Sequence, residues 1–339
     1  MKFNIAILVP EGHVRETFLP TSVIQALQKL GSLCFNQGDR YDPETMANML
    51  KDSHVCITGW GCPNLNEAIL SGEKDLRLVA HTGGAVASIV SDYLYDRGIR
   101  VVSGNKLYAE SVAEGCVAYM LAALRRIPYY NNEVQNGRWG NASSYNEGLL
   151  DRKVGMVGFG AIARYLATML KTFRADVKVY DPYVSDEILN EYGVTREDSL
   201  EKLFSECDII SNQLPRTKAT YHLISKDLLN RMPEGSLFVN TARGSTVDEN
   251  GMAEVLATGR IHAVLDVFEE EPLPMTSKLR GMDNVILMPH MGGPTRDRRE
   301  KVGLALAEDI QRLINNQPLV HEITKEYAMM MTNDALKLT

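Results

Sequence analysis

The sequence has few cysteines, only two tryptophans and no excess of basic residues. Its five cysteines form no CxxC pair, so we expect no metal or redox centre, and reduced, mostly buried thiols in a cytoplasmic protein. The formal net charge is −7, from 36 basic and 43 acidic side chains. A protein that binds phosphate backbones is expected to present a basic surface, so nucleic acid is not an expected partner.

Long apolar runs are also missing. The first apolar segment ends at Pro10 and is too short for a signal peptide. No continuous apolar stretch approaches the roughly 20 residues that cross a bilayer. We therefore expect no membrane span and no membrane partner.

The chain of 339 residues is long enough for two hydrophobic cores, since single cores stop growing near roughly 250 to 300 residues. Short apolar runs alternate with amphipathic segments, which is typical of parallel α/β architectures. The strands predicted in the first hundred residues are 5–9, 55–58, 78–80 and 100–102. A second series matches a doubly wound nucleotide-binding sheet, with strands predicted at 154–157, 177–180, 208–210, 237–240, 263–266 and 285–287.

Two helical segments and one loop bear on the domain organisation. Residues 108–126 predict a long helix that leads out of the first domain, and 136–148 is rich in turn residues. Apolar residues from Val302 to Leu313 have helical spacing. This last helix either covers the surface or returns the chain to the first domain, and the pattern alone leaves both open.

A glycine-rich fingerprint stands between a predicted strand and a predicted helix. Gly158, Gly160, Ala161 and Ile162 belong to a GxGxxA motif that ends at Ala163. Its glycines permit a tight turn and close approach of backbone N–H groups to a pyrophosphate, and the helix N-terminus favours anionic phosphates. A tight turn without a ligand is the alternative.

Asp181 ends the next predicted strand, about 20 residues after Gly160. A carboxylate there can accept hydrogen bonds from an adenosine ribose and would repel a 2′-phosphate. The sequence therefore predicts NAD as the cofactor, rather than NADP. A turn residue before Pro182 is the alternative role of Asp181.

Arg243, Glu271 and His290 each follow an apolar strand, and open α/β sheets bind ligands at the carboxyl ends of their strands. The fingerprint, the carboxylate and these three residues occur in an order that resembles the D-isomer-specific 2-hydroxyacid dehydrogenase family, of the glycerate and phosphoglycerate dehydrogenase type. The resemblance implies that Arg243 binds the substrate carboxylate and carbonyl, that His290 is the general acid/base and that Glu271 partners His290. Taken singly, each could be an ordinary surface or loop residue.

The same resemblance implies a domain organisation. A discontinuous, flavodoxin-like substrate domain is expected to comprise residues 1–104 and 295–339, and a Rossmann NAD-binding domain residues 105–294. It also implies a homodimer.

The chemistry of the proposed reaction suits these residue types. Reduction of a 2-keto acid places negative charge on the carbonyl oxygen, so the site needs a proton donor and a fixed cation. Histidine is suited to proton transfer near neutral pH, and a neighbouring carboxylate favours its protonated form. Arginine offers a planar fork that matches a carboxylate.

Further positions resemble parts of the family's binding sites. Asp266 resembles the residue that hydrogen-bonds the nicotinamide carboxamide, with capping of a turn as the alternative. The remaining predicted cofactor contacts are Leu214, Pro215, Thr217, Thr241, Ala242 and Gly292. The backbone N–H groups of Gly83, Gly84 and Ala85 are predicted to hold a substrate carboxylate, unless this loop is an ordinary turn at the end of a strand.

The substrate side departs from the family pattern. Many members have arginine near His81, and the segment from Ser103 to Tyr108 lacks the usual asparagines and Pro-Gly. Glu271 weighs against formate dehydrogenases, which typically have glutamine there. We expect a small 2-keto or 2-hydroxy acid, with hydroxypyruvate or glyoxylate preferred. An NADH-binding corepressor on the same scaffold is the alternative function; relatives of S-adenosylhomocysteine hydrolase or alanine dehydrogenase fit poorly around Glu271 and His290.

Overall fold

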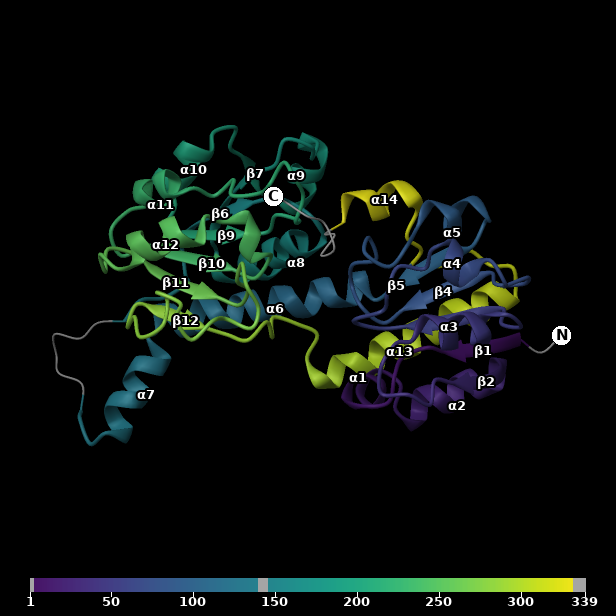
Figure 1. Cartoon of the computed structure of the whole chain (residues 1–339). Coiled ribbons are helices and arrows are strands. Elements are labelled where there is room, and N and C mark those ends of the chain that lie inside the picture. Colours follow the sequence, from purple (N-terminus) through teal and green to yellow (C-terminus); the bar gives the residue numbers. More distant parts are fainter. Residues whose placement is uncertain (1–2, 140–145, 332–339) are drawn as a thin grey trace. The chain divides into compact units, whose positions relative to one another are not determined.

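The computed structural model describes residues 3–139 and 146–331. The chain divides into two compact units: unit 1 comprises Met1–Tyr108 with Pro294–Thr339, and unit 2 comprises Ala109–Gly293. Each unit is a parallel α/β fold, as expected (Figure 1). The first boundary falls a few residues after the predicted one because helix α6 (Asn105–Leu124) begins in unit 1 and continues in unit 2.

The sheet of unit 1 has five parallel strands in the order β2-β1-β3-β4-β5. This is the flavodoxin-like order, and it confirms the predicted fold class of this unit. The strands are β1 (Phe3–Ile7), β2 (Gly31–Phe35), β3 (Val55–Thr58), β4 (Leu78–His81) and β5 (Arg100–Ser103). The helices between them are α1 (His13–Phe18), α2 (Thr21–Leu30), α3 (Pro43–Leu50), α4 (Glu67–Leu70) and α5 (Asp92–Asp96).

Strand β2 was absent from the sequence prediction. It is an edge strand whose side chains are mostly exposed or half-buried, so it lacks the apolar run that marks the inner strands. Its first residue, Gly31, lies so close to β1 that an added Cβ would be 2.1 Å from the backbone oxygen of Phe3.

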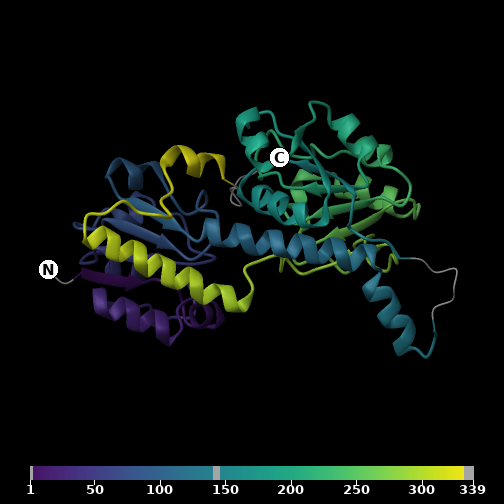
Figure 2. The same ribbon diagram turned by 180° about the vertical axis from the view of Figure 1, so that it is seen from behind.

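Helix α13 (Arg296–Ile314) returns the chain to unit 1, which decides between the two possibilities left open by the sequence. It packs against α1 and α2 and against strands β4 and β5 (Figure 2). Val302, Leu306 and Ile310 are buried in the same core as Phe18. The last described helix, α14 (Lys325–Met330), also belongs to this unit.

The sheet of unit 2 has seven parallel strands in the order β12-β11-β10-β9-β6-β7-β8. Read from β8 to β12, this is the Rossmann order with one added strand. The strands are β6 (Lys153–Val157), β7 (Asp176–Tyr180), β8 (Thr195–Arg196), β9 (Ile209–Asn212), β10 (Leu237–Asn240), β11 (His262–Leu265) and β12 (Val285–Leu287). The two-residue strand β8 is too short to give a sequence signal and was not predicted.

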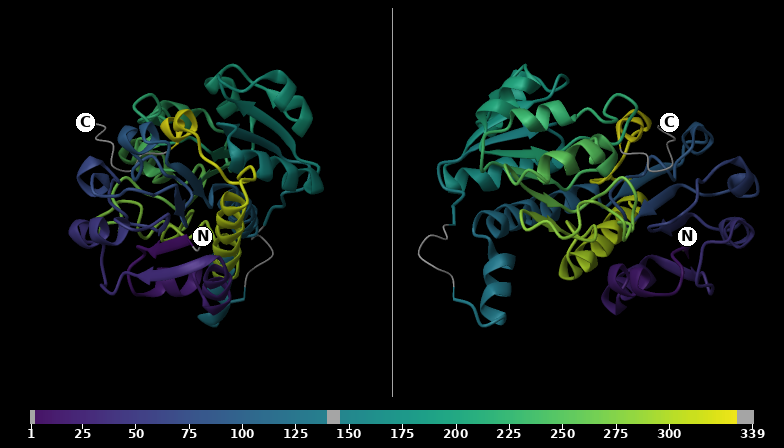
Figure 3. Two further views of the ribbon diagram at one scale, coloured as in Figure 1. Left: turned by 90° about the vertical axis from the view of Figure 1, so that its right-hand side faces the viewer. Right: turned by 60° about the vertical axis from the view of Figure 1, so that its left-hand side comes forward.

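Helices cover both faces of this sheet (Figure 3). Alternate strand residues enter two separate cores: Ile209 packs in one with α6 and α8, and Ile210 packs in the other with α10 and α12. The helices are α8 (Ala161–Leu170), α9 (Asp186–Tyr192), α10 (Leu200–Glu206), α11 (Lys226–Arg231) and α12 (Glu249–Leu256), with short 3₁₀ turns at Lys171–Phe173 and Gly244–Thr246.

The expectation of no membrane span stays a prediction, and helix α6 bears on it. Within the described residues it is the one helix long and apolar enough, by length and composition, to cross a membrane. Ala113, Cys116 and Met120 are fully buried in the core of unit 2, which accounts for much of its apolar character.

The predicted long helix ends early and is followed by a second helix. Arg126 has a left-handed backbone (φ 51°), and α7 (Ile127–Gln135) begins after it and extends away from the rest of unit 2 (Figure 2). The predicted loop at 136–148 has no regular structure in its described parts, and residues 140–145 lie outside the described residues.

Gly303 provides a test of the packing of α13 on unit 1. An added Cβ would lie 2.0 Å from the backbone oxygen of Phe18. Because backbone must move to admit it, we expect Gly303→Ala to lower the free energy of unfolding by about 1–3 kcal/mol, measured by urea unfolding. Lys301→Ala, on an exposed position of the same helix, should change it by less than about 0.5 kcal/mol. Equal stability of the two variants would contradict this packing.

Candidate functional site

The fingerprint loop connects β6 to α8 with an open space in front of it. Gly158 has φ +95°, and its N–H donates to the Tyr180 carbonyl at 2.8 Å. An added Cβ on Gly160 would meet no atom within 4 Å, and no side chain caps the start of α8 at Ala161. Uncapped N–H groups at a helix N-terminus beside open space suit a pyrophosphate, so this loop fits a dinucleotide.

Asp181 directly follows β7 and braces this loop. One carboxylate oxygen accepts the Phe159 N–H at 2.7 Å, and the other accepts the N–H groups of Tyr183 (2.8 Å) and Val184 (3.2 Å). The turn role considered for Asp181 is therefore observed, whereas its contact with a ribose stays a prediction. A carboxylate has about four acceptor positions, so one remains for a ribose hydroxyl.

The other predicted cofactor residues lie in loops at the carboxyl ends of the strands. Leu214, Pro215 and Thr217 follow β9, Thr241 and Ala242 follow β10, Asp266 follows β11, and Gly292 follows β12. Parallel strands place these ends along one edge of the sheet, so the structure brings these loops to the same edge as the fingerprint.

Two asparagines that the sequence analysis missed organise these loops. The Asn212 amide donates to Asn240 Oδ1 at 3.0 Å and to the Thr246 hydroxyl at 2.7 Å. Their carbonyl oxygens accept the N–H groups of Leu214 (3.2 Å) and Ala242 (3.1 Å). Each asparagine is the last residue of an apolar strand. A polar residue at that position is the sequence signal that could have identified it.

Asp266 is buried and holds the loop after β12. Its two oxygens accept the N–H groups of Met291 and Gly292, both at 2.7 Å. Burial raises the pKa of this carboxyl above its usual value, although these hydrogen bonds oppose the shift. Asp266 therefore holds the loop after β12 rather than capping the turn that follows it, and its contact with a nicotinamide stays a prediction.

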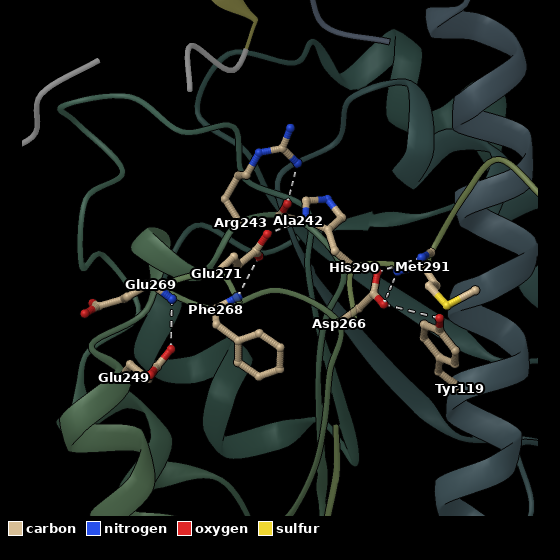
Figure 4. Close-up of polar contacts among 11 residues, drawn as sticks. Tyr119, Ala242, Arg243, Glu249, Asp266, Phe268, Glu269, Glu271, His290 and Met291 are labelled. Atoms are coloured by element: carbon tan, nitrogen blue, oxygen red, sulfur yellow. Dashed lines mark hydrogen bonds and ion pairs between the residues drawn. The ribbon is translucent and has the colours of Figure 1, made fainter. Parts of the chain in front are cut away.

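His290 and Glu271 form a close pair in unit 2 (Figure 4). His290 Nδ1 lies 2.7 Å from Glu271 Oε2, and Glu271 Oε1 accepts the Phe268 N–H at 3.0 Å. The His290 backbone is left-handed (φ 52°), and its N–H donates to the Asp266 carbonyl at 2.9 Å. The imidazole is about half exposed, which leaves it accessible to a ligand.

The Glu271 carboxyl is held in its ionised form. Its partial burial acts to raise its pKa, but the hydrogen bonds from His290 and from the Phe268 N–H, with the charges of His290 and Arg243, lower the pKa below its usual value. An ionised Glu271 accepts the Nδ1 proton of the imidazole, so Nε2 on the far side of the ring is the atom that can exchange a proton.

Arg243 lies beside this pair (Figure 4). It precedes Gly244, where an added Cβ would lie only 1.9 Å from the backbone of Phe268. The loops after β10 and β11 must therefore touch, and this contact places Arg243 next to Glu271. The guanidinium donates to the Ala242 carbonyl at 2.7 Å. The three residues are thus brought together, while their roles stay predictions.

The predicted carboxylate loop belongs to unit 1, whereas the residues above belong to unit 2. Gly83, Gly84 and Ala85 follow β4, and no hydrogen bond joins their N–H groups to any other residue in the described parts of the chain. An added Cβ on Gly83 would lie 2.3 Å from His81 Nε2. Burial lowers the pKa of His81 to about 4, so this residue is neutral and offers no positive charge to a carboxylate.

Among residues 3–139 and 146–331, no group of three or more histidine, cysteine or acidic side chains is arranged to hold a metal ion.

Comparison with known proteins identifies the family. The family model for the NAD binding domain of D-isomer specific 2-hydroxyacid dehydrogenases matches residues 117–292. D-3-phosphoglycerate dehydrogenase of Methanocaldococcus jannaschii is 31% identical over 300 residues, which cover 88% of this chain and 56% of that protein. Hydroxypyruvate reductase of Thermotoga maritima is 34% identical over 245 residues, or 71% of this chain and 79% of that protein.

A solved structure of similar fold is the NADPH-dependent glyoxylate/hydroxypyruvate reductase of Sinorhizobium meliloti. It has a TM-score of 0.78 and 21% identity, and the match covers 98% of this chain and 100% of the other. The chain spans about half the length of the phosphoglycerate dehydrogenases that it matches. Together, the family model and the relatives show that this chain belongs to the D-isomer-specific 2-hydroxyacid dehydrogenase family.

The lowered pKa of Glu271 predicts a pH dependence of stability. A carboxyl whose native pKa lies below its unfolded value of 4.5 stabilises the fold above that value, and this contribution disappears as the pH falls through the native pKa. The stability difference between the wild type and Glu271→Gln should therefore be largest near neutral pH and shrink below pH 4.5. Asp266 is present in both proteins, so its titration does not change the stability difference between them.

Urea unfolding at a series of pH values measures this difference. Glu270→Gln, at the exposed neighbouring position, is the control and should show no such trend. A Glu271→Gln difference that is constant with pH would contradict the ionised pair.

Proposed function

We propose that this protein is an NAD-dependent dehydrogenase that interconverts a small 2-keto acid and a D-2-hydroxy acid. The observation that carries the proposal is the 2.7 Å pair of His290 and Glu271, with Arg243 beside it, at the sheet edge that carries the fingerprint loop. Membership of the family supports the same reaction class.

In this proposal, each residue has a separate chemical task. The cofactor supplies the hydride when bound. His290 donates a proton from Nε2 to the carbonyl oxygen as negative charge develops there, and takes it back in the oxidative direction. Glu271 holds the Nδ1 proton and stabilises the charged imidazole. Arg243 binds the substrate carboxylate through its planar fork and polarises the carbonyl.

The preference for NAD rests on Asp181. Its carboxylate is held at the end of β7 by three backbone N–H groups, so it cannot turn away from an approaching 2′-phosphate without breaking them. The similar fold of an NADPH-dependent reductase does not decide the cofactor, since one side chain at this position can change the preference.

For the substrate, we propose hydroxypyruvate or glyoxylate. This proposal is supported by the relative named as a hydroxypyruvate reductase, while the phosphoglycerate dehydrogenases among the relatives make a phosphorylated acid the main competitor. The N–H groups of Gly83, Gly84 and Ala85 are proposed to bind a carboxylate in unit 1.

We also propose a cytoplasmic homodimer. Helix α7 has no buried residue, and Ile127 and Val134 are more than half exposed. A second copy that covers this helix would remove that apolar surface from water.

Turnover of 2-keto acids tests the reaction. NADH oxidation, followed by absorbance, should be rapid with one acid of a panel that includes hydroxypyruvate, glyoxylate and phosphohydroxypyruvate. His290→Ala should lower kcat by roughly a hundredfold or more, because it removes the proton donor, with NADH affinity nearly unchanged. NADH binding without turnover of any acid would favour a cofactor-sensing role over an enzyme.

The cofactor preference has its own test. Asp181→Asn removes the charge but keeps one carbonyl oxygen for the loop, so the ratio of kcat/KM with NADH to that with NADPH should fall by about tenfold. Asp227→Asn, at an exposed position in the first turn of helix α11, is the control and should leave the ratio unchanged. An unaltered ratio in Asp181→Asn would remove the basis for the NAD assignment.

A further inference from the structure

A second set of charged side chains holds the loop that carries Glu271. Glu249, at the start of α12, accepts the Glu269 N–H through Oε2 at 2.9 Å (Figure 4). The Glu269 side chain in turn contacts His222 Nε2 through Oε1. The His222 ring stacks on Tyr221, with centroids 4.0 Å apart, and its backbone N–H donates to Ser245 at 3.0 Å.

Glu249 and His222 contact the loop at 268–271 but do not belong to it, whereas Glu271 is part of this loop. Glu271 accepts the Phe268 N–H at 3.0 Å, one residue before the Glu269 N–H that Glu249 accepts. The two neighbouring backbone donors are thus fixed by two different carboxylates. A displacement of Glu269 would move Phe268 and Glu271 together, because only one residue separates Glu269 from Glu271.

The environment of Glu249 disfavours the ionised form of its carboxyl group. Burial raises the pKa of its carboxyl, and the negative charges of Glu269, Glu270 and Glu271 raise it further, while the hydrogen bond from Glu269 opposes the shift. The charged groups that act on it come from the loop after β11, and His222 contacts the side chain of Glu269. An acid placed against three others needs a compensating contact, and the Glu269 N–H supplies it.

We propose that Glu249 and His222 are positioning residues, which hold Glu269 and thereby keep Glu271 on the Nδ1 atom of His290. This inference rests on the proposed function for its effect on turnover, but its structural part concerns Glu271 alone. Neither residue follows the carboxyl end of an apolar strand, so neither was a sequence candidate.

Four variants separate positioning from simple structural support. Glu249→Ala removes the acceptor for the Glu269 N–H, whereas Glu249→Gln keeps an acceptor oxygen. Glu254→Ala is the matched control, since Glu254 lies on the same helix and pairs with Lys226 at the exposed surface. His222→Asn is a second route to the same loop, because asparagine tolerates the left-handed backbone (φ 51°) but is too short to reach Glu269.

Two readouts are needed, and only one depends on activity. With the 2-keto acid that is turned over, Glu249→Ala and His222→Asn should lower kcat by about tenfold with the KM for NADH unchanged, and Glu249→Gln should restore most of it. In the ligand-free protein, ¹³C NMR titration should give the Glu271 carboxyl a higher pKa in Glu249→Ala than in Glu249→Gln, because both variants remove the same negative charge but only Glu249→Ala lets the hydrogen-bond donors of Glu271 loosen. His222→Asn should also raise this pKa, and Glu254→Ala should leave it unchanged.

The outcomes distinguish the two proposals. If no acid is turned over but the Glu271 pKa is higher in Glu249→Ala than in Glu249→Gln, the positioning role stands and the proposed function fails. If turnover is present, but folded Glu249→Ala and His222→Asn keep the kcat of the wild type and Glu249→Ala has the same Glu271 pKa as Glu249→Gln, the positioning role is overturned. If Glu249→Ala does not fold, His222→Asn decides by the same two readouts.

Discussion

The arrangement of unit 2 depends on the parallel pairing of β6 with two neighbours. β6 pairs with β7 on one side and with β9 on the other, so the chain reverses its direction of travel across the sheet at this strand. The loop after β6 therefore has no helix from an adjacent connection in front of it. This is why an open space faces Gly160.

Polar side chains at strand ends turn this edge into an ordered surface. Asp181, Asn212, Asn240 and Asp266 each end or follow a strand. Asp181 and Asp266 accept backbone N–H groups of a neighbouring loop, whereas each asparagine accepts an N–H group of the loop that follows it. A loop held in this way loses little conformational freedom when a ligand binds, so less of the binding free energy is spent on ordering it. The close contact at Gly244 holds the loops after β10 and β11 together. It therefore also fixes the positions of Arg243 and Glu271, which these loops carry.

Much of this could be predicted from the sequence, because the inner strands are apolar runs and the fingerprint is local. The order of Arg243, Glu271 and His290 after successive strands was also readable, since parallel strands share an edge. Strands β2 and β8 were missed because an edge strand with exposed side chains, or one of two residues, has no apolar run. Helix α7 was missed because none of its residues is buried. Contacts between distant segments, such as Glu249 with the loop at 268–271, depend on tertiary packing, which no local pattern encodes.

The return of α13 to unit 1 has a consequence for synthesis of the chain on the ribosome. Unit 2 is continuous, so all of its strands have emerged before α13 is made. Unit 1 has its five strands early, but Ile5, Ile7 and Val102 lack part of their apolar cover until Val302, Leu306 and Ile310 arrive. During that interval the first sheet exposes an apolar face to water, so it is the segment that most needs protection from aggregation in the cell.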